Sequence, residues 1–427
     1  MDTPICDFID KYAKNDALRL HMPGHKGKEY TGCEKGDITE IPGADSLYEA
    51  EGIICQSEHN AGKLFGADTF YSAEGSSLCI RAMLYLAALY AKHNRKKPLV
   101  IAARNVHKTF VSAAALLDFD IMWLTGKEEE SYLSCRIDPD KLENMLTGMT
   151  DKPAAVYITS PDYLGNISDV EKISRICHKH GVLLLTDNAH GAYLKFLPRS
   201  LHPLDLGADI CCDSAHKTLP VLTGGAYLHI SPSAPDFFRE HAKRALALFG
   251  STSPSYLILR SLDMANKYLS DGYGDRFGTF VKSVEQIKQR LSQKYSFIGD
   301  EPIKLTIETK KYGYTGYEFA QELAKRNIVC EFADPDYIVL MLTIETGEEG
   351  LIKLENALTD IPCRNPITIC PPAVSTAHKV MSVREAVFSP AETLPVKECL
   401  GRVFASASFG CPPAVPIAVS GERIDAD

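Results

Sequence analysis

The sequence predicts an α/β fold: a large domain built on a mostly parallel sheet with helices on both faces, followed by a smaller α+β domain. Strand-length apolar runs alternate with helix-like stretches from about residue 78 to residue 230, which is typical of consecutive βαβ units. The pattern changes near residue 275, where an amphipathic helix and then short strands follow. With 427 residues, 45% hydrophobic and 24% charged, the chain can bury the cores of two domains.

The large domain is expected to span residues 1–275 and to include an N-terminal arm. Its predicted strands are short and apolar, with β-branched residues, and its predicted helices are longer and follow them in alternation. The strands are expected at 99–103, 120–124, 154–158, 182–186 and 225–230, and the helices at 78–93 and 168–180.

The small domain is expected to span residues 276–427 and to end in a Pro-rich loop. No internal repeat or low-complexity tract stands out in the chain. The predicted elements are a helix over 276–292, strands near 303–308, 328–332 and 337–343, a connector over 365–376, and a short helix over 382–387.

Charge and cysteine usage exclude several classes of protein. The net charge is −9 and the longest basic block is Arg95-Lys96-Lys97, so no nucleic-acid partner is predicted. No apolar run reaches membrane-spanning length, and the acidic stretch Met1–Asp7 lacks the apolar core of a signal peptide. The thirteen cysteines form no CxxC pair and are read as reduced thiols, which predicts a cytoplasmic protein.

One lysine carries most of the chemical information. Lys217 lies between Ser214, His216 and the apolar run that starts at Leu219. Partial desolvation lowers the pKa of an amine, and only the neutral amine attacks a carbonyl. Ser214 and His216 offer hydrogen bonds to a phosphate. The run suits a lysine that forms a Schiff base with pyridoxal 5'-phosphate (PLP), although a solvated loop lysine fits the run by itself equally well.

An acidic residue ends a predicted strand thirty residues before this lysine. The apolar run 181–186 stops at Asp187, and ligands of open α/β sheets bind at the carboxyl ends of strands. A carboxylate there pairs with the pyridine nitrogen of PLP and keeps it protonated. Ala189 is small enough to lie against the ring, and His190 can reach the phenolic oxygen. Capping of a turn is the alternative for Asp187, but the order of Asp187 and Lys217 favours the cofactor.

Two further segments complete the predicted cofactor site. Gly75 permits close backbone approach, and Ser76 and Ser77 offer hydroxyls at the N-cap of the following helix, where an anion is favoured. His107 follows the strand at 99–103, where an imidazole can stack on a flat ring. Taken alone, these residues are better explained by ordinary helix capping and by a structural histidine.

Seven motifs along the chain resemble a known family. They run in the family's order from about residue 4 to residue 424 and therefore cover essentially the whole chain. The chain is similar to the PLP-dependent ornithine/lysine/arginine decarboxylases of fold type I, in a short form without an N-terminal wing domain. The motifs are Leu20–Gly27, Thr39–Asp45, Arg104–Lys108, Asp187–Gly191, Ser214–Lys217, Gly250–Tyr256 and Cys411–Glu422.

The resemblance implies a PLP-binding domain with a seven-stranded, mostly parallel sheet and assigns a role to each site residue. Lys217 would hold PLP, Asp187 would pair with the pyridine nitrogen, and His107 and Ala189 would lie on the two faces of the ring. The phosphate would be held by Gly75, Ser76, Ser77, Ser214 and His216. Ser251 or Thr252 would reach the phosphate of a neighbouring subunit, which implies a homodimer or higher homo-oligomer, and His21, His25 and Lys26 would lie near the active site.

The same resemblance implies the reaction. It is the decarboxylation of arginine, lysine or ornithine to carbon dioxide and a polyamine-type amine, and hence a role in polyamine biosynthesis. Asp187 would keep the ring an electron sink, and Lys217 or a nearby acid would return a proton to Cα. The candidates for an acidic group that binds the distal cation of the substrate are Asp45, Glu74 and Glu422.

Some positions depart from the family pattern and leave the substrate open. They are the phosphate loop Ala73–Ser77, Asn188 in place of a common acidic residue, Ala414, Ser420, and an end at Asp427 that is earlier than in relatives. The alternatives are another fold type I enzyme, such as an aminotransferase or lyase, and a PLP-binding protein without activity.

No metal is predicted. A metal-dependent hydrolase using His21, His25, His107, Asp187, His190 and His216 is a more distant alternative. It is disfavoured because Pro23-Gly24 breaks the helix that a His21–His25 metal pair requires.

Overall fold

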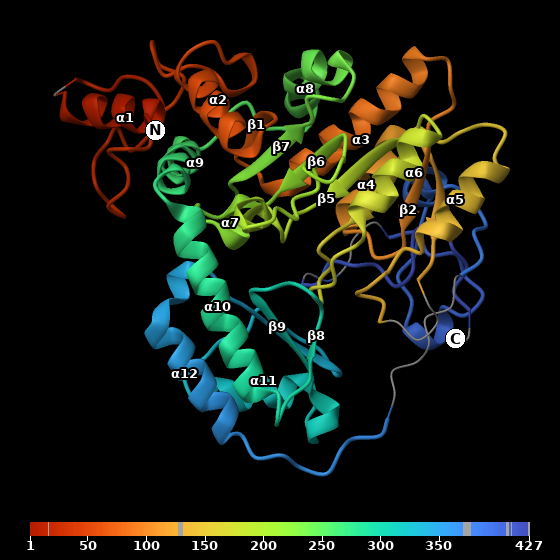
Figure 1. The fold of residues 1–427 in the computed structure, drawn as a ribbon. Coiled ribbons are helices and arrows are strands. Elements are labelled where there is room, and N and C mark those ends of the chain that lie inside the picture. Colours follow the sequence, from red (N-terminus) through yellow and green to blue (C-terminus); the bar gives the residue numbers. More distant parts are fainter. Residues whose placement is uncertain (16, 127–130, 370–376, 407–409, 411, 426–427) are drawn as a thin grey trace.

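The chain folds around a seven-stranded sheet with the order β1-β7-β6-β5-β4-β2-β3 (Figure 1). The computed structural model describes residues 1–427 apart from 16, 127–130, 370–376, 407–409, 411 and 426–427. β7 is antiparallel to both of its neighbours, and the other pairings are parallel. The strands are β1 (Asp68–Ser72), β2 (Leu99–Ala103), β3 (Asp120–Leu124), β4 (Ala155–Thr159), β5 (Leu183–Asp187), β6 (Ile210–Asp213) and β7 (Ala226–Ile230).

Both faces of this sheet are covered because its central strands are apolar on both sides. Val100 and Ala102 point to one face with α3, α4 and α8, whereas Ile101 points to the other with α5 and α6. The helices of these faces are α3 (Gly75–His93), α4 (Lys108–Leu117), α8 (Asp236–Phe249), α5 (Pro139–Gly148) and α6 (Val170–Lys179). The predicted doubly covered α/β sheet is confirmed.

The N-terminal region packs beside β1 and β7. Asp263 on α9 accepts hydrogen bonds from the main-chain N–H groups of Ile5 and Cys6, both at 3.0 Å, and from Ser57 Oγ at 2.5 Å. These contacts join α1 (Pro4–Lys14), α2 (Ile53–Phe65) and α9 (Tyr256–Ser270) into one bundle. Residues 17–46 run between α1 and α2 as an arm without helix or strand.

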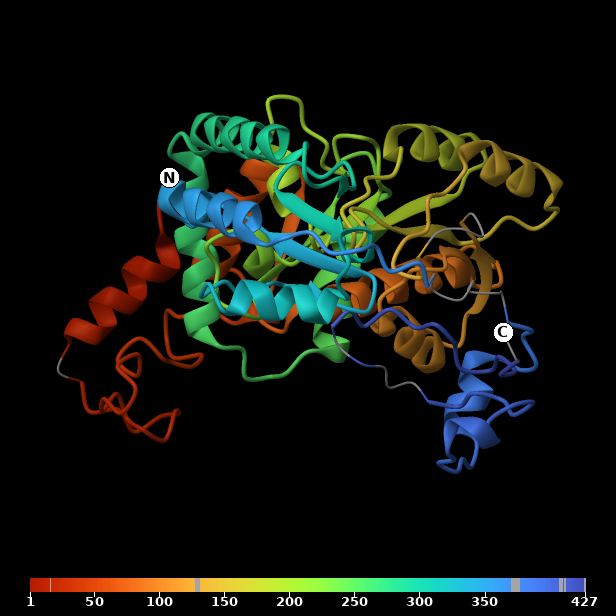
Figure 2. The same ribbon diagram turned by 90° about the horizontal axis from the view of Figure 1, so that it is seen from below.

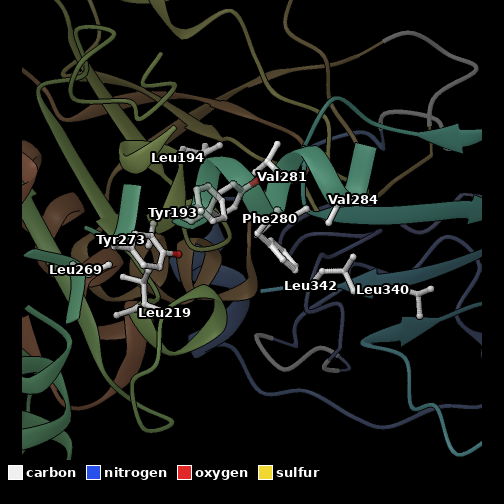
Figure 3. Packing of buried hydrophobic residues seen from close by; sticks show 14 of the residues in the cluster. Tyr193, Leu194, Leu219, Leu269, Tyr273, Phe280, Val281, Val284, Leu340 and Leu342 are labelled. Carbon is white, nitrogen blue, oxygen red and sulfur yellow. The ribbon is translucent and has the colours of Figure 1, made fainter. Parts of the chain in front are cut away.

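A four-stranded antiparallel sheet with the order β10-β11-β9-β8 forms the second layer of the molecule. α10 (Tyr273–Leu291) runs from the large domain to this sheet, and its apolar side chains make the two cores continuous (Figure 3). Tyr273 lies near Tyr193 and Leu269 of the large domain, and Val284 lies toward Leu340 and Leu342 of the small sheet. The remaining elements are β8 (Phe297–Ile298), β9 (Lys304–Glu308), α11 (Gly316–Ala324), β10 (Phe332–Ala333), β11 (Tyr337–Met341) and α12 (Gly347–Asp360).

The C-terminal residues return to the large sheet. The described part of residues 377–425 includes α13 (Val383–Phe388), which lies beside the large domain (Figure 2), and Val415, which packs against a cluster that includes Phe332 and Val339 of the four-stranded sheet. Val383 and Val419 pack in the same cluster as α4 and β2, and Arg384 donates to the main-chain oxygen of Ala115 at 2.9 Å. We propose that this segment belongs with the large domain, which would divide the predicted unit 276–427 near residue 377.

Most predicted elements of the large domain are found within one or two residues of their expected ends. Four strands of the two sheets, β1, β6, β8 and β10, were missed or misplaced. β1 and β6 were not predicted as ranges, because their sequences contain polar or cysteine residues beside few apolar ones. The strand expected near 328–332 is the two-residue β10 at Phe332–Ala333. Part of the connector expected over 365–376 lies outside the described residues. Among the described helices, none has both the length and the apolar character needed to cross a membrane.

Candidate active site

One cavity of about 480 Å³ lies at the carboxyl edge of the seven-stranded sheet. The segments that follow β1, β2, β5 and β6 meet there, because parallel strands end at the same edge. Ten of the twelve predicted cofactor residues line it: Gly75, Ser76, Ser77, His107, Asp187, Ala189, His190, Ser214, His216 and Lys217.

Lys217 lies on the short helix α7 (Ala215–Thr218), directly after β6. Its Nζ is 3.0 Å from Nε2 of His190. Burial lowers the pKa of the Lys217 amine, while the nearby Asp187 carboxylate opposes that shift. The amine is therefore easier to deprotonate than a surface lysine, as a carbonyl-attacking group requires.

Asp187 ends β5 and is 2% exposed. Its Oδ2 accepts a hydrogen bond from Tyr157 OH at 3.1 Å, and its Oδ1 accepts one from the main-chain N–H of Ala189 at 3.2 Å. Burial raises the pKa of Asp187, and the charge of Lys217 counteracts the rise. A buried carboxylate in this position is suited to a cationic ring nitrogen, because such a partner offsets the unfavourable burial of its charge.

His107 is the N-cap residue of α4. Its Nδ1 accepts a hydrogen bond from the main-chain N–H of Thr109 at 3.2 Å, which leaves the proton on Nε2. Burial lowers the pKa of His107 to about 3, with the nearby Lys217 charge acting in the same direction. The ring is thus neutral at physiological pH, and a neutral ring can stack on a flat cofactor.

The phosphate-binding segment differs in detail from the prediction. α3 begins at Gly75 and its N-cap residue is Glu74, so Ser76 and Ser77 lie in the first turn rather than at the N-cap. Gly75 has a φ of 71° and donates its N–H to the oxygen of Gly224 at 2.7 Å. The first turn of a helix still leaves main-chain N–H groups free for an anion.

Ser214 and His216 lie beside this turn. Ser214 Oγ donates to Ser76 Oγ at 2.8 Å, which brings the β6 segment to the start of α3. His216 Nδ1 donates to the main-chain oxygen of Gly225 at 2.9 Å, since a carbonyl only accepts. Its Nε2 therefore donates to a phosphate only when the ring is protonated. Burial lowers the pKa of His216, and a phosphate dianion would shift it back upward.

The residues that are present fit PLP. His190 is 5% exposed, and its Nδ1 has no hydrogen-bond partner among the described residues. Because Nε2 faces the Lys217 amine, Nδ1 is left as a buried polar atom that a ligand oxygen can satisfy. Hydroxyls and free N–H groups for a phosphate, a buried carboxylate for a ring nitrogen and a buried amine for an aldehyde all line the same cavity.

Ser251 and Thr252 are the two predicted cofactor residues that do not line this cavity. They lie on an exposed turn after α8, and the N–H of Ser251 donates to Glu74 Oε1 at 2.5 Å. Their predicted contact is with a neighbouring subunit, so this arrangement within one chain does not test it.

Asp45 and Glu422, two of the three candidates for the substrate's acidic partner, are engaged elsewhere. Asp45 accepts main-chain hydrogen bonds from Gly52 and Ile54 at the start of α2. Glu422 is 3.0 Å from Arg104 and is buried. Glu74 does line the cavity.

The arm residues also lie outside the cavity within one chain. His21 contacts Tyr12 OH at 2.6 Å, and His25 is 3.2 Å from Asp37. The Nζ of Lys26 donates to the main-chain oxygen of His21 at 2.5 Å. Four of the six residues of the metal alternative line the cavity, but His21 and His25, the pair on which that alternative depended, do not. The one His/Cys/Asp/Glu group with metal-binding spacing among the described residues is different: His202, Cys211 and Asp213.

Sequence reasoning missed several residues of the cavity. The most important is Glu331, which precedes β10 and accepts a hydrogen bond from Tyr163 OH at 3.2 Å. Tyr163 packs edge-on against both His190 and Phe332, with ring centroids 5.2 and 5.1 Å away. No local signal marks Glu331, because only the tertiary fold brings it to the cavity. The other missed lining residues are Asn105, Leu133, Thr159, Thr223, Gly224, Pro412, Pro413 and Val415.

Comparison with known proteins decides the family. The model of one protein family, described as "Orn/Lys/Arg decarboxylase, major domain", matches residues 3–299, which is more than half of the chain. The chain belongs to the Orn/Lys/Arg decarboxylase family. It is 28% identical to an arginine decarboxylase of Halalkalibacterium halodurans over 99% of this chain and 91% of that protein. It is 27% identical to the uncharacterized protein YaaO of Bacillus subtilis over 99% of this chain and 92% of that protein.

Solved structures agree on the fold. The lysine decarboxylase LdcF of Francisella novicida superimposes with a TM-score of 0.77, at 17% identity, over 99% of this chain and 75% of that one. A likeness at this identity supports the fold alone. The predicted fold type I architecture, the PLP cofactor and the classification as a decarboxylase are confirmed by the family and the fold together.

Proposed function

We propose that this decarboxylase removes the α-carboxylate of a basic amino acid, with arginine as the first candidate, and releases the corresponding amine and carbon dioxide. The observation that carries the proposal is the carboxylate of Glu331, which lines the same cavity as Lys217. A carboxylate at the cavity wall attracts the distal ammonium or guanidinium of such a substrate. The relatives that cover nearly the whole chain and are named arginine decarboxylase favour the guanidinium.

The residues of the chain would share the work as follows. Bound PLP supplies an electron sink for the pair released from the Cα–carboxylate bond. Asp187 would hold a proton on the ring nitrogen of PLP. The neutral imidazole of His107 would stack on the face of the PLP ring. Lys217 would give up its place to the substrate amine and afterwards hold a proton on Nζ that can be returned to Cα. His190 Nε2, 3.0 Å away, would accept from that Nζ and orient it.

Glu74 is the second acidic group of the cavity, but it is less suited to the substrate. It is the N-cap residue of α3, beside the proposed phosphate site, and its Oε1 already accepts the N–H of Ser251. Glu331 has one neutral partner, Tyr163 OH, among its described hydrogen bonds and is exposed. It can therefore accept further donors from a cationic group.

A panel of amino acids tests this proposal. PLP-loaded protein would be incubated separately with arginine, lysine, ornithine and citrulline, and the products would be identified by mass. We expect carbon dioxide and the corresponding amine from the basic amino acids, with arginine fastest, and none from citrulline, which lacks the charge. Turnover of citrulline at the rate of arginine, or release of a keto acid in place of carbon dioxide, would contradict it. The second result would favour an aminotransferase, since the cofactor site alone does not select the bond that breaks.

We also propose that the active unit is a homodimer. The arm exposes large apolar side chains at Leu18, Leu20, Met22 and Tyr30, from 58% to 83% of their surface. Several large exposed apolar side chains in one short segment are typical of a surface that a second chain covers. Ser251 and Thr252, outside their own cavity, would then be free to reach the neighbouring one. Light scattering of the purified protein tests the mass, and a monomer with full activity would contradict the proposal. A role in polyamine biosynthesis and a cytoplasmic location stay predictions.

A further inference from the structure

A buried polar cluster lies directly behind the active-site edge of the large sheet. Its centre is Asp213, the last residue of β6, which is fully buried. Oδ2 of Asp213 is 3.0 Å from His202 Nε2 and 3.2 Å from His229 Nε2, and Oδ1 accepts the side-chain N–H of Asn188 at 2.6 Å. The carboxylate thus accepts three donors that fix its orientation.

The cluster joins the two strand ends that carry the cofactor chemistry. Asn188 follows Asp187 at the end of β5, and Asp213 precedes the segment that leads to Lys217. Asn188 packs closely against Gly191: a Cβ atom added to Gly191 would lie 2.1 Å from Oδ1 of Asn188. The side-chain hydrogen bond from Asn188 to Asp213 therefore adds a second contact between these two strand ends, beside the main-chain bond from the Asn188 N–H to the Cys212 oxygen at 3.0 Å.

We propose that Asp213 is a positioning residue that, through Asn188, sets the placement of Lys217 relative to Asp187 and hence the affinity for PLP. The two histidines hold the Asp213 side chain, and the Asn188 amide transmits its position to β5. This inference rests on the proposed roles of Lys217 and Asp187. Its readout is cofactor binding rather than turnover, so failure to decarboxylate any basic amino acid would leave it standing.

A structural metal is the competing explanation for this cluster, since His202, Cys211 and Asp213 have metal-binding spacing. The geometry favours the hydrogen bond between Asn188 and Asp213 over a metal site. Both oxygens of Asp213 already accept hydrogen bonds, and a cation would displace them.

A donor–acceptor swap tests the proposal. Asn188→Asp places a second carboxylate against Asp213, and two carboxylates at this distance cannot both ionise. Asn188→Asp with Asp213→Asn restores the link in reverse: the new amide donates to the new carboxylate, and its oxygen accepts from both histidines. PLP binding and the pH midpoint of the visible absorption of the lysine–PLP imine would be measured for each variant.

We expect the single variant to weaken PLP binding about tenfold or more and to shift the pH midpoint, and the swap to return both to within about twofold of the wild type. Asp263→Asn is the matched control. Asp263 is equally buried and accepts three hydrogen bonds, but it lies in the α1–α2–α9 bundle, so its variant should lower the melting temperature without changing either readout.

Three results would overturn the proposal. The first is a single variant that binds PLP like the wild type. The second is a swap that folds with a normal melting temperature but binds PLP about tenfold or more weakly than the wild type; this comparison does not need a folded Asn188→Asp variant. The third is a stoichiometric metal in the purified protein that Cys211→Ser removes, because Asp213 would then be a ligand.

Discussion

The two sheets contribute to the active site in different ways. The seven-stranded sheet supplies its groups at strand ends, in short contiguous stretches such as Asp187–His190 and Ser214–Lys217. The four-stranded sheet supplies one carboxylate, Glu331, at a two-residue strand that no motif surrounds. Under our proposal the residues that bind the cofactor (the cofactor side) follow from local sequence, whereas the residue that binds the substrate (the substrate side) is placed by the packing of the two sheets.

The physical reason lies in what each side binds. PLP is the same group in every relative, so the same donors and the same strand-end geometry recur. Under our proposal the distal group of the substrate lies between the two sheets. The packing around α10 and the cluster of Leu133, Leu164, Phe332 and Val339 together set the distance between the sheets. Changes on the two sides should therefore have separable effects on the cofactor and on the substrate.

The largest expected effect comes from Lys217→Ala, which removes the amine that binds PLP. Without the amine no imine forms, so the visible absorption of the PLP-loaded protein should vanish, and turnover should fall about 10³-fold or more because the proton carrier is also lost. Absorption spectra and single-turnover assays check this. Lys26→Ala is the control: Lys26 lies in the arm, outside the cavity of its own chain, and its variant should keep the absorption. Retained absorption in Lys217→Ala would refute the assignment.

Glu331→Gln should weaken substrate binding without changing PLP binding. A charge-assisted contact contributes about 1.5–3 kcal/mol, so we expect KM for the basic amino acid to rise about 10- to 100-fold with an unchanged PLP absorption. Steady-state kinetics and the absorption spectrum are measured on the same samples. Glu308→Gln is the matched control, since Glu308 ends β9 of the same sheet and pairs with Lys311 at 2.7 Å. An unchanged KM, or a loss of PLP, would remove the distinction between the two sides.

The same division explains what could be predicted from the sequence. Strands β2 and β3 and the residues Lys217, Asp187 and His107 follow from local apolar runs and the polar residues that end them. Glu331 and Tyr163 could not be found, because nothing near them in the sequence differs from an ordinary loop. Asp45 and Glu422 were reasonable candidates by charge, yet one caps α2 and the other pairs with Arg104, and both facts depend on contacts remote in the chain.

The C-terminal segment forms a third wall of the cavity. Glu422→Gln tests whether the contact between Arg104 and Glu422 holds this segment in place. Arg104 donates to the main-chain oxygens of Pro416 and Ile417 and to Glu422, and Pro412, Pro413 and Val415 of the same segment line the cavity. Loss of one buried ionic partner should lower the free energy of unfolding by about 1–3 kcal/mol and raise KM a few-fold. Denaturant unfolding and kinetics check this.

The control for this wall is Glu392→Gln, which removes an exposed ionic partner of Arg402 in the same segment and should change the free energy of unfolding by less than about 1 kcal/mol. Equal effects of the two substitutions would show that the Arg104–Glu422 contact does not hold the wall.

The smallest expected effect is a change with pH in the contribution of His107 to the free energy of unfolding. The folded-state pKa of His107 is about 3, whereas an unfolded histidine titrates near 6.5. Between these values the unfolded apoprotein binds the extra proton, so the contribution of His107 is fully present above pH 6.5 and falls as the pH drops, by about 1 kcal/mol at pH 5.5. The difference in free energy of unfolding between the wild type and His107→Phe should shrink accordingly from pH 7.5 to pH 5.5. A constant difference would mean that His107 is not held neutral.

The most direct measurement of the central claim is borohydride reduction of the PLP-loaded protein followed by peptide mapping. The account predicts one reduced PLP adduct, on Lys217. Lys304, a second buried lysine that lies 2.7 Å from Glu301, should stay unlabelled. An adduct on Lys304 or on another lysine, or no adduct at all, would contradict the account.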